Sequence, residues 1–164
     1  MLQKKICMLG AFAVGKTSLV RRYVESIFSD AYHTTVGVKI SKKVVRVNDS
    51  EVKLVLWDLY GEDGFQQMHW QYLQGASGYL LVADGTRLAT LDKALALEQK
   101  AREVVGALPF VFVVNKCDLA DDWAFDATLE AQLAAKNWTI LRSSAKTGEG
   151  VNEAFASLTG KMLG

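Results

Sequence analysis

Proline, cysteine and histidine are scarce in this chain, whose 164 residues include one proline, two cysteines and two histidines. Cys7 and Cys117 lie far apart and match no metal-ligand spacing, so a reducing cytosol is the simplest setting and a cytoplasmic protein is expected. No stretch approaches the roughly 20 consecutive apolar residues that a membrane span needs. Because Pro109 is the only proline and no linker or repeat divides the chain, we expect one domain over residues 1–164.

Charge of one sign is also lacking, since the formal net charge is only +1. A nucleic-acid-binding surface would need a strongly basic stripe, so no nucleic-acid partner is expected. Residues 161–164 hold no cysteine, lipidation box or polybasic run, and no direct membrane anchor is expected. Half of the residues are hydrophobic, which indicates a globular fold with a sizeable core.

The N-terminal segment allows two interpretations. Lys4 and Lys5 precede an apolar run over residues 6–14, a pattern that superficially matches a secretory signal. The alternative is a buried strand that leads into a phosphate-binding loop. The glycines and the lysine at the end of the run favour the loop.

Short apolar runs alternate with segments of helical spacing along the chain. Strands are expected at residues 5–9, 38–47, 51–58, 79–83, 110–115 and 139–142, and helices at 15–25, 65–73, 91–106, 127–136 and 150–162. Asn48, Asp49 and Ser50 predict a hairpin turn, and Thr90 can cap the third helix. We therefore expect a doubly wound α/β fold with a mostly parallel six-stranded sheet, one antiparallel hairpin edge and about five helices. Ligands of such sheets bind at the carboxyl ends of the strands.

A phosphate-loop motif follows the first expected strand. Residues 10–17 fit the pattern Gly-x4-Gly-Lys-Thr and open the first helix, which is the context of a P-loop nucleoside triphosphatase. Gly10 and Gly15 allow the tight curve that turns backbone N–H groups toward phosphates. Lys16 can reach the β- and γ-phosphates, and the Thr17 hydroxyl can ligate Mg²⁺. A chance glycine-rich turn is the alternative, and the motif does not select the base.

Two further elements follow later strands and resemble the Ras superfamily of small GTPases. Asn115-Lys116-Cys117-Asp118 matches the superfamily's Asn-Lys-x-Asp motif, and Ser144-Ala145-Lys146 matches its Ser-Ala-Lys element. A carboxylate can accept two hydrogen bonds from the donors of guanine, whereas adenine lacks that donor pair. The resemblance gives this role to Asp118, with contacts from the other residues of both motifs. It also implies nucleotide contacts from these residues: Ala13, Val14, Ser18 and Phe28.

The resemblance extends to magnesium and to two switch segments. Asp58 and Gly61 match the superfamily's Asp-x-x-Gly element, in which the aspartate holds Mg²⁺ through water and the glycine N–H contacts the γ-phosphate. Thr35 resembles the switch threonine that ligates Mg²⁺ only when the γ-phosphate is present. The stretch 33–38 is most similar to the Rab and related branches. A G domain that binds GTP, GDP and Mg²⁺, with protein effectors and regulators as partners, is what the resemblance implies.

Two residues depart from the superfamily pattern. Glu62 stands where a glutamine normally orients the attacking water, and Phe12 occupies a loop position that is usually small. The resemblance places catalysis at Lys16, Thr35, Gly61 and Glu62, but a carboxylate lacks the amide donor and is repelled by phosphate oxygens. Slow hydrolysis of GTP is therefore expected. A pseudo-GTPase that holds guanine nucleotide without efficient turnover is the alternative.

Other aromatic residues and a third functional class complete the expectations. Trp57 and Phe65 are expected to pack under the second switch, whereas Trp70 could pack there or face a partner. Trp123 and Trp138 are expected to be packing residues. A P-loop kinase or ATPase is disfavoured by Asp118 and by residues 144–146.

Overall fold

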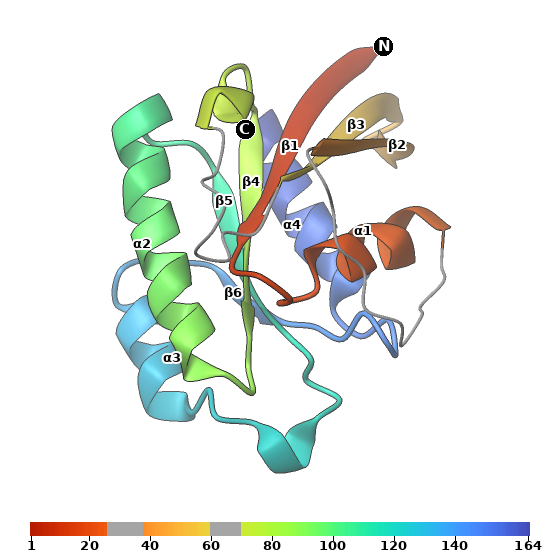
Figure 1. The fold of residues 1–164 in the computed structure, drawn as a ribbon. Helices are drawn as coiled ribbons and strands as arrows, with labels where there is room; N and C mark the ends of the chain where they lie inside the picture. The colour runs from red at the N-terminus through yellow and green to blue at the C-terminus, as the bar shows by residue number, and fades with distance from the viewer. Residues whose placement is uncertain (26–37, 60–69) are drawn as a thin grey trace.

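The structure is a computed structural model and describes residues 1–25, 38–59 and 70–164. Six strands form one sheet in the order β2-β3-β1-β4-β5-β6 (Figure 1). The strands are β1 (Leu2–Gly10), β2 (Val38–Val47), β3 (Ser50–Leu59), β4 (Gly78–Asp84), β5 (Phe110–Asn115) and β6 (Ile140–Arg142). Only β2 and β3 pair antiparallel, so the mostly parallel sheet with one hairpin edge is confirmed.

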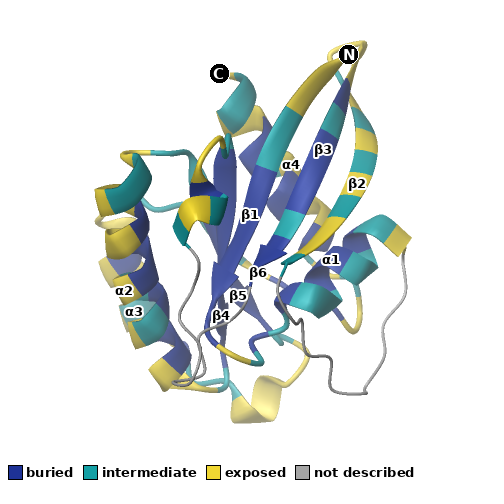
Figure 2. Cartoon of the chain, turned by 45° about the horizontal axis from the view of Figure 1, so that its top comes forward, coloured by how far each residue is buried: buried dark blue, intermediate teal, exposed yellow. Residues whose placement is uncertain are grey.

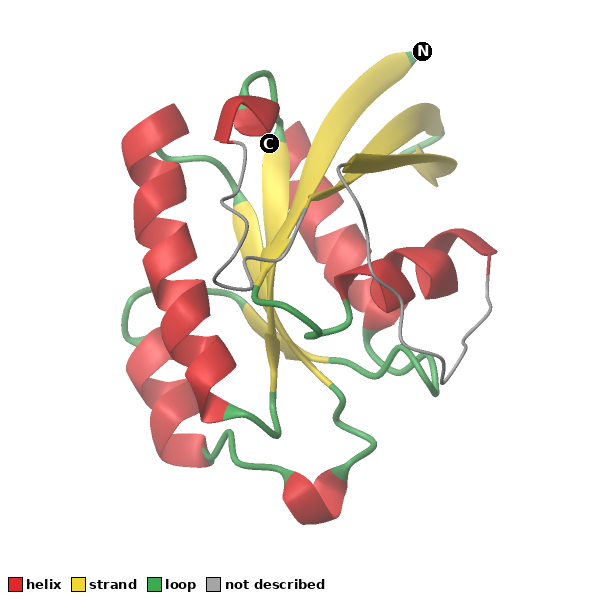
Figure 3. Ribbon diagram, viewed as in Figure 1, coloured by secondary structure: helices red, strands yellow, loops and turns green. Residues whose placement is uncertain are grey.

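Helices cover both faces of this sheet (Figure 3). The described residues form four α-helices, α1 (Lys16–Glu25), α2 (Leu88–Val105), α3 (Ala127–Ala134) and α4 (Val151–Leu163), and two short 3₁₀ helices, η1 (Trp70–Leu73) and η2 (Ala120–Asp122). The fifth helix expected at residues 65–73 is thus a single 3₁₀ turn where the structure describes it, and residues 60–69 lie outside the described residues.

Two hydrophobic clusters fill the space between the sheet and its helices. One packs α1 and α4 against one face, and the other packs α2 and α3 against the opposite face. Every residue of β4 is buried, as the continuous apolar run predicts for a strand covered on both sides (Figure 2). The helices present apolar faces at the expected spacing, with Val151, Phe155 and Leu158 of α4 all buried.

Trp123 and Trp138 are packing residues, as expected. Trp138 meets the rings of Phe110 and Phe112 edge to face, with centroids 5.2 and 5.5 Å away. Trp123 lies against Gly85, where an added Cβ would come within 2.1 Å of the indole ring. Both tryptophans belong to the cluster on the α2 and α3 side of the sheet.

The helix α2 begins earlier than expected. Its N-cap is Arg87, and Thr90 lies inside the first turn rather than at the cap. The Thr90 hydroxyl accepts a hydrogen bond from the Asp84 N–H at 2.9 Å and lies 2.7 Å from the Arg87 carbonyl oxygen. Thr90 therefore ties the end of β4 to the start of α2, and the predicted cap is wrong.

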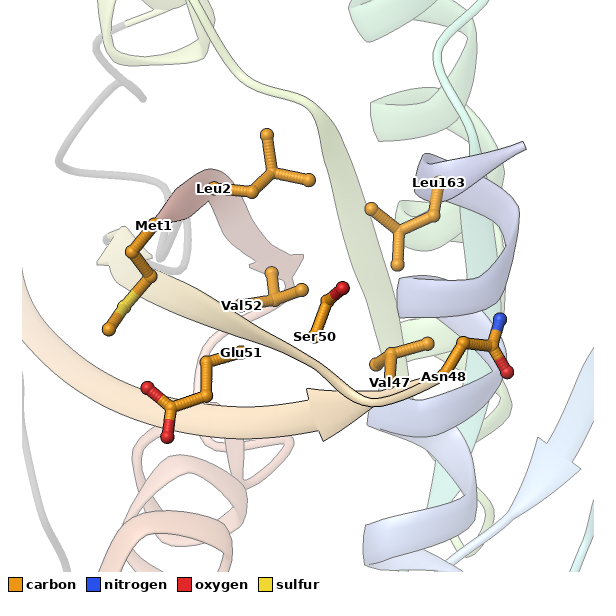
Figure 4. A pocket seen from close by; sticks show the side chains of 8 residues that line it. All are labelled: Met1, Leu2, Val47, Asn48, Ser50, Glu51, Val52 and Leu163. Atoms are coloured by element: carbon orange, nitrogen blue, oxygen red, sulfur yellow. The ribbon is translucent and has the colours of Figure 1, made fainter.

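The hairpin turn between β2 and β3 is confirmed. Val47 pairs with Ser50, so Asn48 and Asp49 form a two-residue turn, and both have positive φ values, 49° and 64°. Near this turn an open pocket of about 700 Å³ lies between the hairpin, Leu2 and Leu163 (Figure 4). It adjoins the start of β1, whereas the phosphate-loop motif follows the end of β1. No helix in the described parts of the chain is long and apolar enough to cross a membrane.

Candidate functional site

The carboxyl ends of β1, β3, β4 and β5 meet at one edge of the sheet, and the predicted motifs follow three of these strands. The phosphate loop follows β1 at Gly10, Asp58 lies near the end of β3, and Asn115 ends β5. Segments that are far apart in the sequence therefore come together on one side of the molecule (Figure 1). This is the edge at which a doubly wound sheet binds its ligands.

Glycine is required at both ends of the phosphate loop for different reasons. A Cβ on Gly10 would lie 2.5 Å from the Val82 carbonyl oxygen of the neighbouring strand. Gly15 has a φ of +101°, and a Cβ there would lie 2.3 Å from the Asn115 side-chain nitrogen. Between them Ala13 also adopts a positive φ, 61°. The loop is thus tightly curved and touches two neighbouring strands.

The Lys16 side chain is buried behind this loop. It is only 7 % exposed, and its ammonium donates to the carbonyl oxygens of Gly10 and Ala11 at 3.2 and 3.4 Å. Burial lowers the pKa of Lys16 to about 8, although the Asp58 carboxylate acts in the opposite direction. A buried ammonium with so little compensating charge is stabilised by an anion, and nucleotide phosphates supply one.

Two oxygen atoms that suit magnesium lie next to this lysine. The Thr17 hydroxyl at the start of α1 donates to the Asp58 carboxylate at the end of β3, at a distance of 2.5 Å. Asp58 is only 1 % exposed. Hydroxyl and carboxylate oxygens are hard donors, and Mg²⁺ in nucleotide sites is typically held by one or two such groups plus phosphate oxygens. The residues present therefore fit a magnesium ion.

Asn115 connects the phosphate loop to the loop after β6. Its buried amide nitrogen donates to the Val14 carbonyl oxygen at 3.0 Å. Its amide oxygen accepts from the Ser143 hydroxyl at 3.0 Å and from the Ala145 N–H at 3.3 Å. Gly15 leaves the space that the Asn115 amide occupies, so the Asn115 side chain lies against the phosphate loop.

The residues expected to read the base also lie side by side. The Asp118 carboxylate accepts a hydrogen bond from the Ser144 hydroxyl at 2.7 Å, which joins the two predicted base loops. From α1, the Arg22 guanidinium donates to the carbonyl oxygens of Ala145 (at 2.7 Å) and Lys146. The second base loop is thereby fixed to the helix that follows the phosphate loop. Ser18 lies in the first turn of that helix, partly buried.

Two residues that no sequence motif identifies support the phosphate loop: Arg87 contacts the loop directly, and Asp84 pairs with Arg87. Asp84 ends β4, and its buried carboxylate accepts from Arg87 at 3.0 Å and from Lys116 at 2.9 Å. Arg87 and Lys116 both donate onward to the Ala13 carbonyl oxygen. The available signal was positional, since a carboxylate directly follows a fully apolar strand at the ligand-binding edge of the sheet.

Several expected site residues lie outside the described residues, namely Phe28, Thr35, Gly61 and Glu62. Phe65, which is expected to pack under the second switch, lies there too. Phe12 is described and is 39 % exposed at the phosphate loop. Trp57 and Trp70 are partly buried against the cluster on the α2 and α3 side. The second switch, under which Trp57 is expected to pack, falls on residues 60–69, outside the described residues.

Comparison with known proteins agrees with this arrangement. The model of the Ras family matches residues 5–164. The GTP-binding protein ypt5 of Schizosaccharomyces pombe is 32 % identical over 165 residues, which cover 98 % of this chain and 78 % of ypt5. Human Ras-related protein Rab-7L1 is 34 % identical over 169 residues, which cover 97 % of this chain and 82 % of that protein. Human Ras-related protein Rab-7b is 31 % identical over 166 residues, with the same coverage.

The family match covers residues 5–164, and the fold brings the predicted motifs to one edge of the sheet. The phosphate loop, the Thr17 and Asp58 oxygens and the two base loops lie together there. They follow the strands in the order that the sequence resemblance predicts. The chain therefore belongs to the Ras family of small GTPases, which bind and hydrolyse guanine nucleotides.

Proposed function

We propose that residues 1–164 form one G domain that acts as a slow guanine-nucleotide switch. The observation that carries the proposal is the contact between Thr17 and Asp58 beside the buried ammonium of Lys16. At this edge of the sheet, the Thr17 and Asp58 oxygens can bind a divalent cation, and the neighbouring Lys16 ammonium can bind phosphates. A nucleoside triphosphate bound with Mg²⁺ has the complementary charges.

Each group of residues has a distinct part in this function. Lys16 and the N–H groups of residues 13–18 bind the phosphates, and Thr17, Thr35 and Asp58 hold Mg²⁺. When bound, Mg²⁺ neutralises charge that develops on the phosphate oxygens during hydrolysis. Glu62 and the Gly61 N–H act at the γ-phosphate. The remaining site residues hold the base and ribose: Phe28, Asn115, Lys116, Asp118, Ser144, Ala145 and Lys146.

The proposed switch follows from the dependence of Thr35 and Gly61 on the γ-phosphate. Both residues interact with the γ-phosphate of GTP and lose this partner when GTP becomes GDP. The protein surfaces near them therefore change with the bound nucleotide. Protein effectors would distinguish the two states at these surfaces. Exchange factors and activating proteins would act on the same segments.

Slow hydrolysis is proposed from Glu62 and from Phe12. A carboxylate at position 62 cannot donate a hydrogen bond to the γ-phosphate, and its charge opposes an approach to phosphate oxygens. The exposed ring of Phe12 adds bulk at the phosphate loop, where a catalytic group from an activating protein would enter. The same two residues favour the second candidate, a module that holds guanine nucleotide without efficient turnover.

Single-turnover hydrolysis separates these candidates. Purified protein is loaded with GTP and Mg²⁺, and the GDP fraction is measured after extraction at each time point. Conversion over minutes to hours supports the slow switch, whereas retained GTP without conversion supports the nucleotide-holding module. Glu62→Gln is expected to raise the rate, and an unchanged rate would contradict the role given to Glu62. Displacement of bound GDP by equimolar ATP would contradict the proposal itself.

A further inference from the structure

Arg87 connects the end of β4 to the phosphate loop across 74 or 75 positions of sequence. Its Nε donates to the Asp84 carboxylate at 3.0 Å. A terminal nitrogen of the same guanidinium donates to the carbonyl oxygens of Phe12 at 3.1 Å and Ala13 at 2.9 Å. The planar fork of an arginine can satisfy both directions at once, which a lysine ammonium on a single stem cannot reproduce.

These contacts fix the direction of successive peptide groups in the loop. In a trans peptide the N–H of the next residue points opposite to the carbonyl, and the described residues contain no cis peptide bond. The carbonyls of Phe12 and Ala13 are held by Arg87, and that of Val14 is held by Asn115. The N–H groups of residues 13, 14 and 15 therefore point away from these donors.

The backbone carbonyl groups of the phosphate loop point in two different directions. The carbonyls of Gly10 and Ala11 point to the Lys16 ammonium, whereas those of residues 12–14 point to the donors at the ends of β4 and β5. The N–H groups of residues 13–15 thus point to the side of the loop opposite to Arg87 and Asn115, and the Lys16 ammonium contacts the same loop at Gly10 and Ala11. A run of convergent N–H groups beside a cation is the arrangement that binds phosphate.

The Asp84 carboxylate, which pairs with Arg87, is ionised at neutral pH. Its side chain is 1 % exposed. Burial alone would raise the pKa of Asp84, but hydrogen bonds from Thr86, Lys116 and Arg87 outweigh it and hold the pKa below its ordinary value. The ionised carboxylate forms ion pairs with Arg87 at 3.0 Å and with Lys116 at 2.9 Å. Both cations also donate hydrogen bonds to the Ala13 carbonyl oxygen.

We infer that Arg87 is a positioning residue that holds the phosphate loop in its phosphate-binding form and thereby slows the release of guanine nucleotide. The inference rests on the proposed function, because it concerns the affinity of that same site for nucleotide phosphates. This role requires no contact between Arg87 and the nucleotide. Arg87 acts through the carbonyl oxygens of Phe12 and Ala13, so its effect falls on phosphate binding and not on the choice of base.

The experiment compares three proteins loaded with a fluorescent GDP analogue: the wild type, Arg87→Met and Arg102→Met. Arg102 is the matched control because it belongs to α2, the helix that Arg87 caps, and also pairs with a carboxylate, that of Glu98 at 2.9 Å. Its contact is far from the phosphate loop. Arg87→Met is expected to release GDP at least about tenfold faster than wild type, because two charged hydrogen bonds to the loop are lost. Arg102→Met is expected to stay within about twofold, because distant sites without shared partners rarely couple by more than about 0.5 kcal/mol.

A second readout separates loop positioning from general loosening of the fold. The affinities for GDP and for GMP are measured by competition with the same fluorescent GDP analogue. Because GDP carries one phosphate more than GMP, Arg87→Met is expected to lower the GDP-to-GMP affinity ratio. Arg87→Lys, which keeps the charge but not the fork, is expected to give an intermediate ratio and serves if the methionine variant does not fold.

The outcomes are distinguishable. Equal losses of GDP and GMP affinity would show a merely structural role and would overturn the inference. A GDP release rate like that of wild type in both Arg87→Met and Arg87→Lys would overturn it as well, while leaving the proposed function intact. A wild-type protein that binds no guanine nucleotide would overturn both the proposed function and this inference.

Discussion

The Thr17 hydroxyl and the Asp58 carboxylate lie 2.5 Å apart, although 41 positions separate them in the sequence. We predict that Asp58→Asn weakens the binding of Mg²⁺ beside the nucleotide, so that a higher Mg²⁺ concentration is needed to retain GDP. An amide keeps the shape of the side chain but loses the charge that orders the water shell of the cation. Changes to such supporting groups typically lower metal affinity about 10–100-fold.

The measurement is a titration of Mg²⁺ against the rate of GDP release. The midpoint is expected to move about 10–100-fold higher in Asp58→Asn. Asp121→Asn is the control, because Asp121 is an exposed carboxylate on η2. The same midpoint in Asp58→Asn and in wild type would remove Asp58 from the magnesium site.

We predict that Gly15→Ala displaces the Asn115 amide from the phosphate loop. The new Cβ would lie 2.3 Å from the Asn115 side-chain nitrogen, so the 3.0 Å contact with the Val14 carbonyl cannot persist. GDP affinity measured by fluorescence titration should fall by at least about tenfold. Gly106→Ala controls for backbone strain, since Gly106 also has a positive φ, 79°, but its Cβ would meet nothing within 4 Å. Similar GDP losses in both variants would contradict this explanation.

We predict that Gly85→Ala destabilises the protein through collision with Trp123. The Cβ would lie 2.1 Å from the indole ring, and overpacking of this kind costs about 1–3 kcal/mol. Thermal unfolding at a fixed GDP concentration should show a Tm about 2–10 °C lower than wild type. Gly160→Ala is the opposite control, because its Cβ meets nothing within 4 Å inside α4, and it should stabilise by about 0.5–1 kcal/mol.

The collision can be verified with a double variant. Trp123→Leu removes the ring that Gly85→Ala would strike, so the two losses should be less than additive when combined. Strict additivity would mean that Gly85 is required for another reason.

We predict that Cys117 reacts slowly with alkylating reagents at neutral pH. Burial, followed by the charge of Glu149 and its contact 3.6 Å from the thiol, raises the pKa of Cys117 from 9.0 to about 11. A raised thiol pKa lowers the thiolate population at every pH below it, here about 100-fold at pH 8 compared with a thiol of pKa 9.0. The alkylation rate should therefore continue to increase with pH well above 9.

Mass spectrometry of the Cys117 peptide after iodoacetamide treatment measures this rate. Glu149→Gln removes the neighbouring charge and is expected to accelerate the reaction. Glu153→Gln, on the exposed face of α4, is expected to leave it unchanged. A faster reaction of wild type than of Glu149→Gln would show that the carboxylate activates the thiol.

The fold was predictable where one local pattern decides the structure. Strand β5 was expected with its observed bounds because its apolar run leaves no alternative of the right length. The start of α2 was predicted wrongly. Thr90 is of a residue type that favours a helix cap, but its hydroxyl contacts the end of β4 instead. Helix α3 ends two residues early, at Ala134, and Asn137 with a φ of 65° turns the chain toward β6.

In the candidate site, too, residues within local motifs were predictable, whereas residues defined by distant contacts were not. Lys16, Thr17 and Asn115 were predicted because short motifs identify them and each motif follows a strand. Asp84 and Arg87 belong to no such motif, and their function depends on partners about 30 or 75 positions away. A single sequence does not reveal such a pairing. The roles given to all the predicted site residues, Thr35 and Glu62 among them, stay predictions.

The phosphate loop is among the first parts of the chain to be synthesised, yet the groups that hold it come much later. Asn115 and Lys116 reach it across 101 and 103 positions. Since synthesis proceeds from the N-terminus, a nascent chain that ends before residue 115 carries the whole loop motif but lacks the contacts from Asn115 and Lys116. The ability to retain nucleotide should thus be acquired late in translation, after β5 has joined the sheet.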